Sequence, residues 1–163
     1  RVQGILVNYR GMVLKAVEEV NECQKSILFD KLYKHFEGDL KGKTIALWGL
    51  AFKPGTDDMR EAPSLVLIER LKAAGCNVRA FDPVAIGEAK RRIGDSIYYA
   101  NDIYDALHEA DALMLVTEWK EFRMPNWSII RKAMNHPVII DGRNIFDSHD
   151  LTEQGFTYYC IGR

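Results

Sequence analysis

The order of hydrophobic and polar positions predicts one long helix followed by six strands that alternate with helices. Over residues 12–36, apolar side chains recur at three- and four-residue steps with charged residues mostly between them, the pattern of an amphipathic helix. Gly38 follows as a stop signal. At 1.5 Å per residue this helix would be about 37 Å long, more than a small domain needs. The first ten residues form no convincing element.

After Gly42 the pattern changes to short apolar runs separated by helical stretches. The predicted strands cover residues 44–48, 77–81, 97–99, 112–116, 138–140 and 157–160. The predicted helices cover residues 62–74, 85–93, 103–109, 127–134 and 148–153. Strands that alternate with helices form a mostly parallel sheet covered on both faces. The fold class is therefore α/β, a Rossmann-like, doubly wound, mostly parallel six-stranded sheet preceded by a long helix.

The order of the strands decides where such a sheet holds a ligand. The doubly wound order 3-2-1-4-5-6 is our first choice, with right-handed crossovers. It puts the topological switch point between the strands at 44–48 and 112–116. Ligands of open α/β sheets bind at this point, beyond the carboxyl ends of the strands.

Composition and charge exclude several classes of protein. An apolar content of 47% with 28% charged residues is ordinary for a soluble chain, and a formal charge of −1 favours neither nucleic acid nor a membrane surface as a partner. No apolar run approaches the roughly 20 residues that span a bilayer. The three cysteines are far apart, show no metal-binding spacing and fit a reduced setting. We therefore expect a cytoplasmic protein without a metal site.

The start of the chain is unusual, because Arg1 stands where an initiator Met is expected. We interpret the sequence as a piece of a longer protein. Its long leading helix is suited to connect two domains or to form an oligomer interface. The alternative, that the helix simply packs on its own domain, stays open.

The connection between the strand at 44–48 and the next helix is the most informative segment. The strand ends at Gly49, and the helical pattern resumes only at about Ala62. Strand-to-helix loops usually take about 2–6 residues, and longer ones are usually functional or disordered. This loop carries Lys53 and Arg60, and two cations facing a helix N-terminus indicate an anion, most often a phosphate.

Three strand ends are expected to converge on one edge of the sheet. The segments that meet there are 49–60, 117–119 and 141–144. The cations of this edge are Lys53, Arg60 and Arg143, and its aromatic residues are Phe52 and Trp119. A nucleotide needs phosphate donors and a flat apolar face for its base. The alternative, ordinary solvated loop cations, stays open, above all for Arg60, which has acidic neighbours.

A dinucleotide fingerprint is absent, because Gly49 lacks the second and third glycines of G-x-G-x-x-G. Asp82, at the end of the second strand, mimics the ribose-binding acid of such folds, and we interpret it as mainly structural. No Ser/His/Asp or Cys/His arrangement is readable from spacing, and Asp57-Asp58 is interpreted as solvated or capping rather than metal-binding. The residues alone predict an α/β domain that binds a phosphate ligand or a nucleotide, with no catalytic arrangement visible in the sequence.

Several segments resemble the UDP-glucose/GDP-mannose dehydrogenase family. Residues 49–64, Gly-Leu-Ala-Phe-Lys-Pro-Gly-Thr-Asp-Asp-Met-Arg-Glu-Ala-Pro-Ser, are similar to its C-terminal signature. Segments that follow the family's pattern in the same order are 17–25, 81–84, 117–122, 141–143 and 155–163. The resemblance covers essentially the whole chain, and within the family it is closest to the bacterial UDP-glucose 6-dehydrogenase branch.

The resemblance implies a two-step oxidation of the sugar C6 alcohol of UDP-glucose to a carboxylate, giving UDP-glucuronate for polysaccharide biosynthesis, with two NAD consumed. The family's catalytic cysteine and NAD-binding glycines belong to an N-terminal domain that this sequence lacks. Cys23 does not replace that cysteine, because it lies within the linking helix. The chain therefore resembles the C-terminal, UDP-binding third of the enzyme and is expected to be inactive alone.

Roles for individual residues also follow from the resemblance. It carries UDP-sugar contacts onto Phe52, Lys53 and Arg143, and it gives Arg60 a place at the domain interface, towards NAD. NAD itself would be bound mainly by the N-terminal domain. Residues 1–40 would be the interdomain and dimerisation helix, making a homodimer, and residues 41–163 the UDP-sugar-binding domain.

Three alternatives differ from this interpretation. One is a dehydrogenase of another nucleotide sugar, such as GDP-mannose or UDP-N-acetylmannosamine. Another is a non-catalytic oligomerisation domain with a vestigial pocket. A flavodoxin-like signalling domain is disfavoured, because Gly49 and Lys53 follow the first strand where an acidic phospho-acceptor cluster would be needed.

Overall fold

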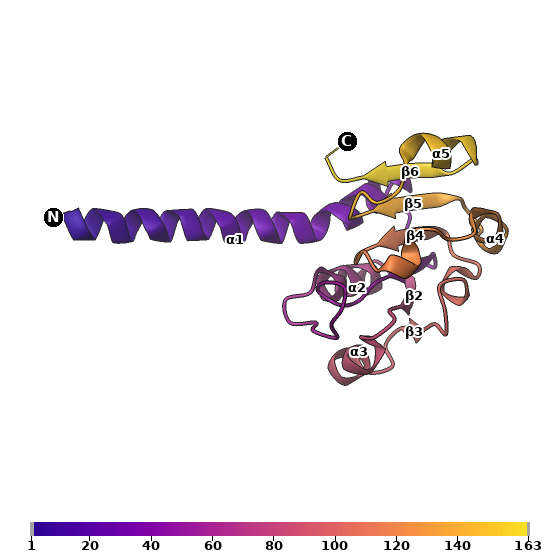
Figure 1. Cartoon of the computed structure of the whole chain (residues 1–163), viewed down its shortest axis with the longest axis horizontal. Coiled ribbons are helices and arrows are strands. Elements are labelled where there is room, and N and C mark those ends of the chain that lie inside the picture. The colour runs from indigo at the N-terminus through magenta and orange to yellow at the C-terminus, as the bar shows by residue number, and fades with distance from the viewer. Residues whose placement is uncertain (1, 163) are drawn as a thin grey trace.

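A long helix, α1, extends away from the rest of the molecule (Figure 1). The computed structural model describes residues 2–162, and side chains from residue 11 onward. Helix α1 spans Val2–His35, 34 residues, and is therefore about 51 Å long. The expectation that the first ten residues form no element was wrong. Adding residues to an existing helix costs little, so the helix continues through Gly11 despite its low helix propensity.

Among the described side chains of α1, from residue 11 onward, those near its C-terminal end pack on the sheet. Leu28 and Leu32 are buried, whereas Val13 and Val17 are exposed. The helix ends as predicted near Gly38, whose φ is +82° and whose N–H donates to the carbonyl of Tyr33. Within residues 2–162, no helix combines the length and apolar character that crossing a membrane requires.

Six parallel strands form one sheet in the order β3-β2-β1-β4-β5-β6, which confirms the predicted order. The strands are β1 Thr44–Trp48, β2 Asn77–Phe81, β3 Tyr98–Tyr99, β4 Ala112–Leu115, β5 Val138–Asp141 and β6 Thr157–Cys160. Strand β1 lies in the middle and pairs with both β2 and β4, with Ile45 opposite Val78 on one side and Ala112 on the other. The switch point therefore falls between β1 and β4.

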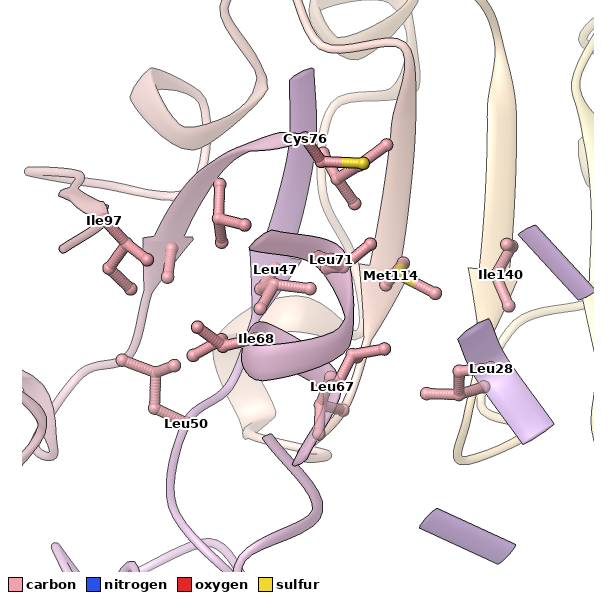
Figure 2. Packing of buried hydrophobic residues seen from close by; sticks show 14 of the residues in the cluster. Leu28, Leu47, Leu50, Leu67, Ile68, Leu71, Cys76, Ile97, Met114 and Ile140 are labelled. Atoms are coloured by element: carbon pink, nitrogen blue, oxygen red, sulfur yellow. The ribbon is translucent and has the colours of Figure 1, made fainter. Parts of the chain in front are cut away.

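Helices cover both faces of the sheet (Figure 1). They are α2 Pro63–Ala73, α3 Ile86–Ile93, α4 Trp127–Ala133 and α5 Ser148–Glu153, with short 3₁₀ helices η1 Asp105–Leu107 and η2 Lys120–Phe122. On β1, Ile45 and Leu47 face the core under α1, α2 and α3, and Ala46 and Trp48 face the core under α4 and α5. Figure 2 shows Leu47 beneath Leu67 and Leu71 of α2 in the first of these cores. Burial on both faces explains the continuous apolar run of this strand.

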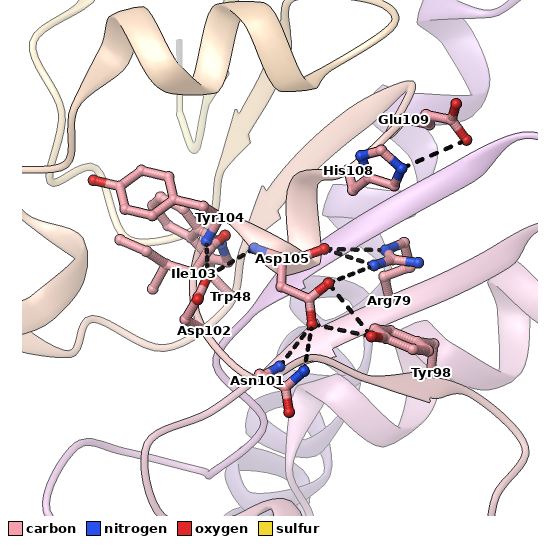
Figure 3. Close-up of polar contacts among 10 residues, drawn as sticks. All are labelled: Trp48, Arg79, Tyr98, Asn101, Asp102, Ile103, Tyr104, Asp105, His108 and Glu109. Atoms are coloured by element: carbon pink, nitrogen blue, oxygen red, sulfur yellow. Dashed lines mark hydrogen bonds and ion pairs between the residues drawn. The ribbon is translucent and has the colours of Figure 1, made fainter.

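The predicted helix at 103–109 is only the single 3₁₀ turn η1. Asp102 caps its start, but the groups that would continue the helix are bonded to other segments. Asp102 accepts the N–H groups of Tyr104 and Asp105 at 2.8 and 2.7 Å. Arg79 donates to the carbonyl of Asp105 at 2.7 Å and pairs with its carboxylate (Figure 3). The Glu109 N–H, which would continue a helix, donates instead to another segment. Hydrogen bonds to segments distant in sequence therefore end the helix after one turn.

Candidate functional site

A cleft of about 950 Å³ lies between α1 and the carboxyl ends of β1, β4 and β5. Its lining includes Phe52, Lys53, Arg60 and Arg143, so the structure brings the four predicted site residues to one cavity. The volume falls within the range of small-molecule sites, roughly 300–1,000 Å³. Trp119, also expected at this edge, is not part of the lining, because its indole N–H donates to Asp82 at 3.1 Å.

The loop after β1 is fixed by hydrogen bonds at its first residues. Gly49 has φ +95°, and a Cβ added there would lie 2.4 Å from Cβ of Thr117. The Thr117 hydroxyl donates to the carbonyl of Ala51, and the Ser64 hydroxyl donates to the carbonyl of Leu50, each at 2.6 Å. These buried hydroxyls tie the loop to the end of β4 and to the start of α2. The loop therefore enters the cleft along a defined path.

A buried carboxylate, Asp82, stands at the end of β2 beside this loop. Five groups donate to it at 2.7–3.1 Å, namely the backbone N–H groups of Leu50, Ala51, Val84 and Ala85 and the indole N–H of Trp119. Hydrogen bonds to an ionised acceptor are about twice as strong as neutral ones. Asp82 thus joins the ends of three segments through one side chain.

Asp141 organises the turn that carries Arg143. Its carboxylate is buried and accepts the N–H groups of Arg143, Ile145 and Phe146 at 2.8–3.0 Å. The Tyr158 hydroxyl donates to it at 2.8 Å. The backbone of Arg143 is therefore held while its side chain turns into the cleft.

The Arg143 side chain is anchored at its Nε atom. This atom donates to the carbonyl of Val116 at 2.7 Å and lies 3.0 Å from Oε2 of Glu118. Oε2 is buried and receives no hydrogen bond from any described residue. The charge of Arg143 is therefore what offsets the loss of its hydration. The terminal nitrogens of the guanidinium make no hydrogen bond within the described part of the chain, which leaves its fork for an anion.

Arg60 forms an ion pair with its neighbour Asp58 at 2.8 Å. This is the local pairing that the sequence left open as an alternative to a ligand contact. Hydrogen bonds from Arg60 lower the pKa of Asp58 to about 2. Because the Arg60 side chain is 78% exposed, this pair is solvated and weak. Its guanidinium therefore exchanges partners at little cost.

Lys53 differs from the other cations of the cleft. Among side chains of residues 11–162, no carboxylate forms an ion pair with it, whereas Lys25, Arg60 and Arg143 are each paired. Its ammonium lies 5.8 Å from the ring centroid of Phe52, which is 46% exposed. An unpaired ammonium beside an exposed aromatic ring suits a phosphate next to an apolar group.

Several residues that line the cleft were not named as site residues from the sequence, among them the charged residues Lys25 and Glu118. Lys25 of α1 lines it with a side chain that is only 14% exposed, and it pairs with Glu22 at 2.7 Å and Glu61 at 3.2 Å. The hydrogen bond to Glu22 raises the pKa of Lys25 despite its partial desolvation. Glu118 also lines the cleft. The signal for Lys25 was its place in segment 17–25, which follows the family pattern, and Glu118 lies in segment 117–119, which was expected at this edge.

The described side chains include no group of three His, Cys, Asp or Glu residues that holds a metal. Cys23 is exposed on α1, and Cys76 and Cys160 are buried. Burial raises the pKa of the Cys76 thiol to about 11, so it is a thiol rather than a thiolate at neutral pH. None of the three lines the cleft.

Comparison with known proteins identifies the family to which this sequence is similar. Residues 46–148 match the UDP-binding domain of the UDP-glucose/GDP-mannose dehydrogenase family. The chain is 49% identical over 160 residues to the UDP-glucose 6-dehydrogenase of Pseudomonas aeruginosa, covering 95% of this chain and 35% of that protein. It is 40% identical to UDP-glucose 6-dehydrogenase TuaD of Bacillus subtilis, covering 95% and 33%. The chain thus spans about a third of the length of these relatives.

Solved structures agree with this assignment. A UDP-glucose dehydrogenase from Pyrobaculum islandicum matches with a TM-score of 0.75 and 28% identity, over 89% of this chain and 31% of that one. A UDP-D-ManNAc dehydrogenase from Pyrococcus horikoshii matches with a TM-score of 0.66 and 31% identity, over 90% and 31%. Because the family match covers more than half of the sequence and includes the loop and the turn that line the cleft, the chain belongs to the UDP-glucose/GDP-mannose dehydrogenase family.

Proposed function

We propose that this chain binds the UDP part of UDP-glucose within an NAD-dependent UDP-glucose 6-dehydrogenase, which makes UDP-glucuronate for polysaccharide biosynthesis in the cytoplasm. The observation that carries the proposal is the ammonium of Lys53, which forms no ion pair with the described side chains and lines a cleft at the switch point of the sheet. The match to a UDP-binding domain supports the nucleotide, and the names of the curated relatives support glucose as the sugar.

Each proposed contact uses a different property of the side chain. Lys53 offers a point charge to the diphosphate, and Arg143 offers a planar fork of donors. Phe52 offers an apolar face beside Lys53. The pairing of Arg143 with Glu118 means that the arginine is oriented before the ligand arrives, which reduces the entropy lost on binding.

NAD is proposed to bind mainly to an N-terminal domain of the same protein. The loop after β1 does not fit a dinucleotide, because its first N–H groups, of Leu50 and Ala51, already donate to Asp82. NAD would act as the hydride acceptor, and no residue of this chain is proposed as catalytic. Arg60, which is exposed, is our candidate for a contact across the domain interface towards NAD.

Calorimetric titration of this chain with UDP-glucose tests the proposal, with GDP-mannose and NAD as control ligands. We expect saturable binding of UDP-glucose alone, because a site that hydrogen-bonds one base rejects another strongly. Tighter binding of GDP-mannose would favour the alternative substrate. Absence of UDP-glucose binding at millimolar concentration would contradict a self-sufficient UDP site.

A UDP-N-acetylmannosamine dehydrogenase is the alternative favoured by a specific observation. The Pyrococcus horikoshii protein, named for UDP-D-ManNAc, is 31% identical to this chain. UDP-glucose and UDP-N-acetylmannosamine share the UDP part and differ in the sugar. In a competition titration, the ligand with the lower Kd therefore identifies the preferred sugar.

Helix α1 supports a second proposal, a homodimer. Its exposed apolar residues are Met12, Val13, Leu14, Val17 and Val20. Val13, Val17 and Val20 recur at steps of four and three residues and therefore share one face of the helix, and exposed apolar surface of this kind marks interaction sites in soluble proteins. Sedimentation analysis should give a dimer that the double change Val17→Lys and Val20→Lys converts to monomer, whereas a monomeric parent chain would contradict this proposal.

A further inference from the structure

The carboxylate of Asp82 stands where a dinucleotide-binding fold of this topology meets its ligand. In such folds the N–H groups of the loop after the first strand point to the pyrophosphate. Here the N–H groups of Leu50 and Ala51 donate to Oδ2 of Asp82 at 2.7 and 3.0 Å. The Asp82 side chain is buried, with its residue 1% exposed. The anion that these amides contact therefore belongs to the protein.

The remaining contacts of Asp82 connect this loop to two other segments. Oδ1 accepts the N–H groups of Val84 and Ala85 at 2.9 and 2.8 Å, which fixes the turn after β2. Oδ2 also accepts the indole N–H of Trp119 at 3.1 Å, which fixes the segment after β4. Both oxygens are thus fully used by the protein, and a network with every member satisfied is rigid.

The residues held by Asp82 lead directly into the candidate site. Ala51 precedes Phe52 and Lys53, and its carbonyl accepts the Thr117 hydroxyl at 2.6 Å. The Phe52 N–H donates to the carbonyl of Asp58 at 2.8 Å, which closes the loop on itself. The direction in which Lys53 leaves the loop therefore depends on the backbone that Asp82 fixes.

We propose that Asp82 is a positioning residue of the nucleotide site, an internal anion that occupies the first amides of the β1–α2 loop. The loop then offers the side chains of Phe52 and Lys53 to the nucleotide instead of its backbone. The diphosphate consequently lies further from the sheet than in a dinucleotide-binding fold. This inference rests on the proposed UDP binding for its functional part, but the hydrogen-bonding part is independent of any ligand.

The test compares Asp82→Asn with Asp111→Asn in this chain. Asparagine keeps the shape of the side chain but removes its charge and turns an amide group towards N–H donors. Asp111 is the matched control, since it is also a buried carboxylate that accepts a backbone N–H, from Thr44 at 2.8 Å. It lies at the amino end of the strands, away from the cleft. We expect Asp82→Asn to raise the Kd for UDP about tenfold and Asp111→Asn to change it less than about twofold.

Amide hydrogen exchange provides a readout that does not require UDP. In the unchanged chain, the amides of Leu50 and Ala51 should be strongly protected, and Asp82→Asn should remove that protection while Asp111→Asn leaves it. Fast exchange of these two amides in the unchanged chain would overturn the inference. So would normal UDP affinity in Asp82→Asn, or an equal loss of affinity in both variants.

A milder variant covers the case in which Asp82→Asn does not fold. Trp119→Phe removes one donor to Asp82 and keeps an aromatic ring outside the cleft lining. It should weaken UDP binding about two- to threefold and speed exchange at Ala51, whereas unchanged values of both would count against the inference. The amides of Leu50 and Ala51 could be protected from exchange in the unchanged chain while the chain does not bind UDP. That result would contradict the proposed function but not the role of Asp82 as an internal anion.

Discussion

Replacing Gly49 by alanine is expected to lower the free energy of unfolding by about 2–5 kcal/mol. About 1–2 kcal/mol comes from placing an L side chain at positive φ, and about 1–3 kcal/mol from overpacking. The φ of Gly49 is +95°, and the added Cβ would lie 2.4 Å from Cβ and 2.6 Å from the backbone nitrogen of Thr117. The segment after β4 is bonded to the segment after β1, because Thr117 donates its hydroxyl to the carbonyl of Ala51 and its N–H to the carbonyl of Trp48. Neither segment therefore moves away easily. Denaturant unfolding measures the difference.

Gly55→Ala is the matched control for this change. Gly55 lies in the same loop with φ +81°, but a Cβ added there meets nothing within 4 Å. It should therefore show only the conformational part, about 1–2 kcal/mol. Equal destabilisation by the two variants would contradict the steric part of the prediction. It would mean that the contact between the β1 and β4 ends relaxes without cost.

Lys53→Ala and Arg143→Ala are each expected to weaken UDP-glucose binding by about 1–3 kcal/mol, the cost of a lost hydrogen bond to a charged group. Calorimetric titration measures the loss. Lys132→Ala, a cation of α4 on the other face of the sheet, is the control and should bind as the unchanged chain does. Unchanged binding in both cleft variants would rule out the proposed contacts.

The two variants should differ in stability. Lys53 has no ion-pair partner among the described side chains, so its removal should leave the free energy of unfolding nearly unchanged. Arg143→Ala leaves the buried oxygen of Glu118 without its compensating charge. A buried polar atom that loses its partner costs more than a pair removed as a whole, and the 33% exposure of both side chains keeps this difference small. Adding Glu118→Gln to Arg143→Ala should therefore recover part of the lost stability without restoring UDP-glucose binding.

Most of the fold could be predicted because its strands are buried on both faces. Strand β1 begins and ends at the predicted residues, since a short apolar run between turn residues has few other interpretations. The strand order followed from the rules of doubly wound sheets. The start of α1 was missed, because glycines within a helix resemble stop signals. The length of η1 was also missed, because it depends on Arg79, which is distant in sequence.

The cluster of cations at the cleft could be predicted because parallel strands bring their carboxyl ends to one edge. The pairing of Arg60 with an acidic neighbour was an open alternative from the sequence, but the partners of the other cations could not be predicted. Arg143 pairs with Glu118 from another loop, and Lys25 reaches the cleft from a helix that the sequence separates from it. Trp119 was expected at the cleft, but its indole turns to Asp82 instead. Such directions are set by tertiary contacts that spacing alone does not reveal.

The position of β1 in the sheet has a consequence for how the molecule is assembled. Strands β1 to β3 come from the first half of the domain and β4 to β6 from the second, and only the pairing of β1 with β4 joins them. This pairing closes a long loop of chain, which is entropically costly and slow compared with local contacts. Lys53 belongs to one half and Arg143 to the other. Both residues reach the cleft only when β1 is paired with β4, so we expect UDP binding to appear together with the complete sheet during refolding.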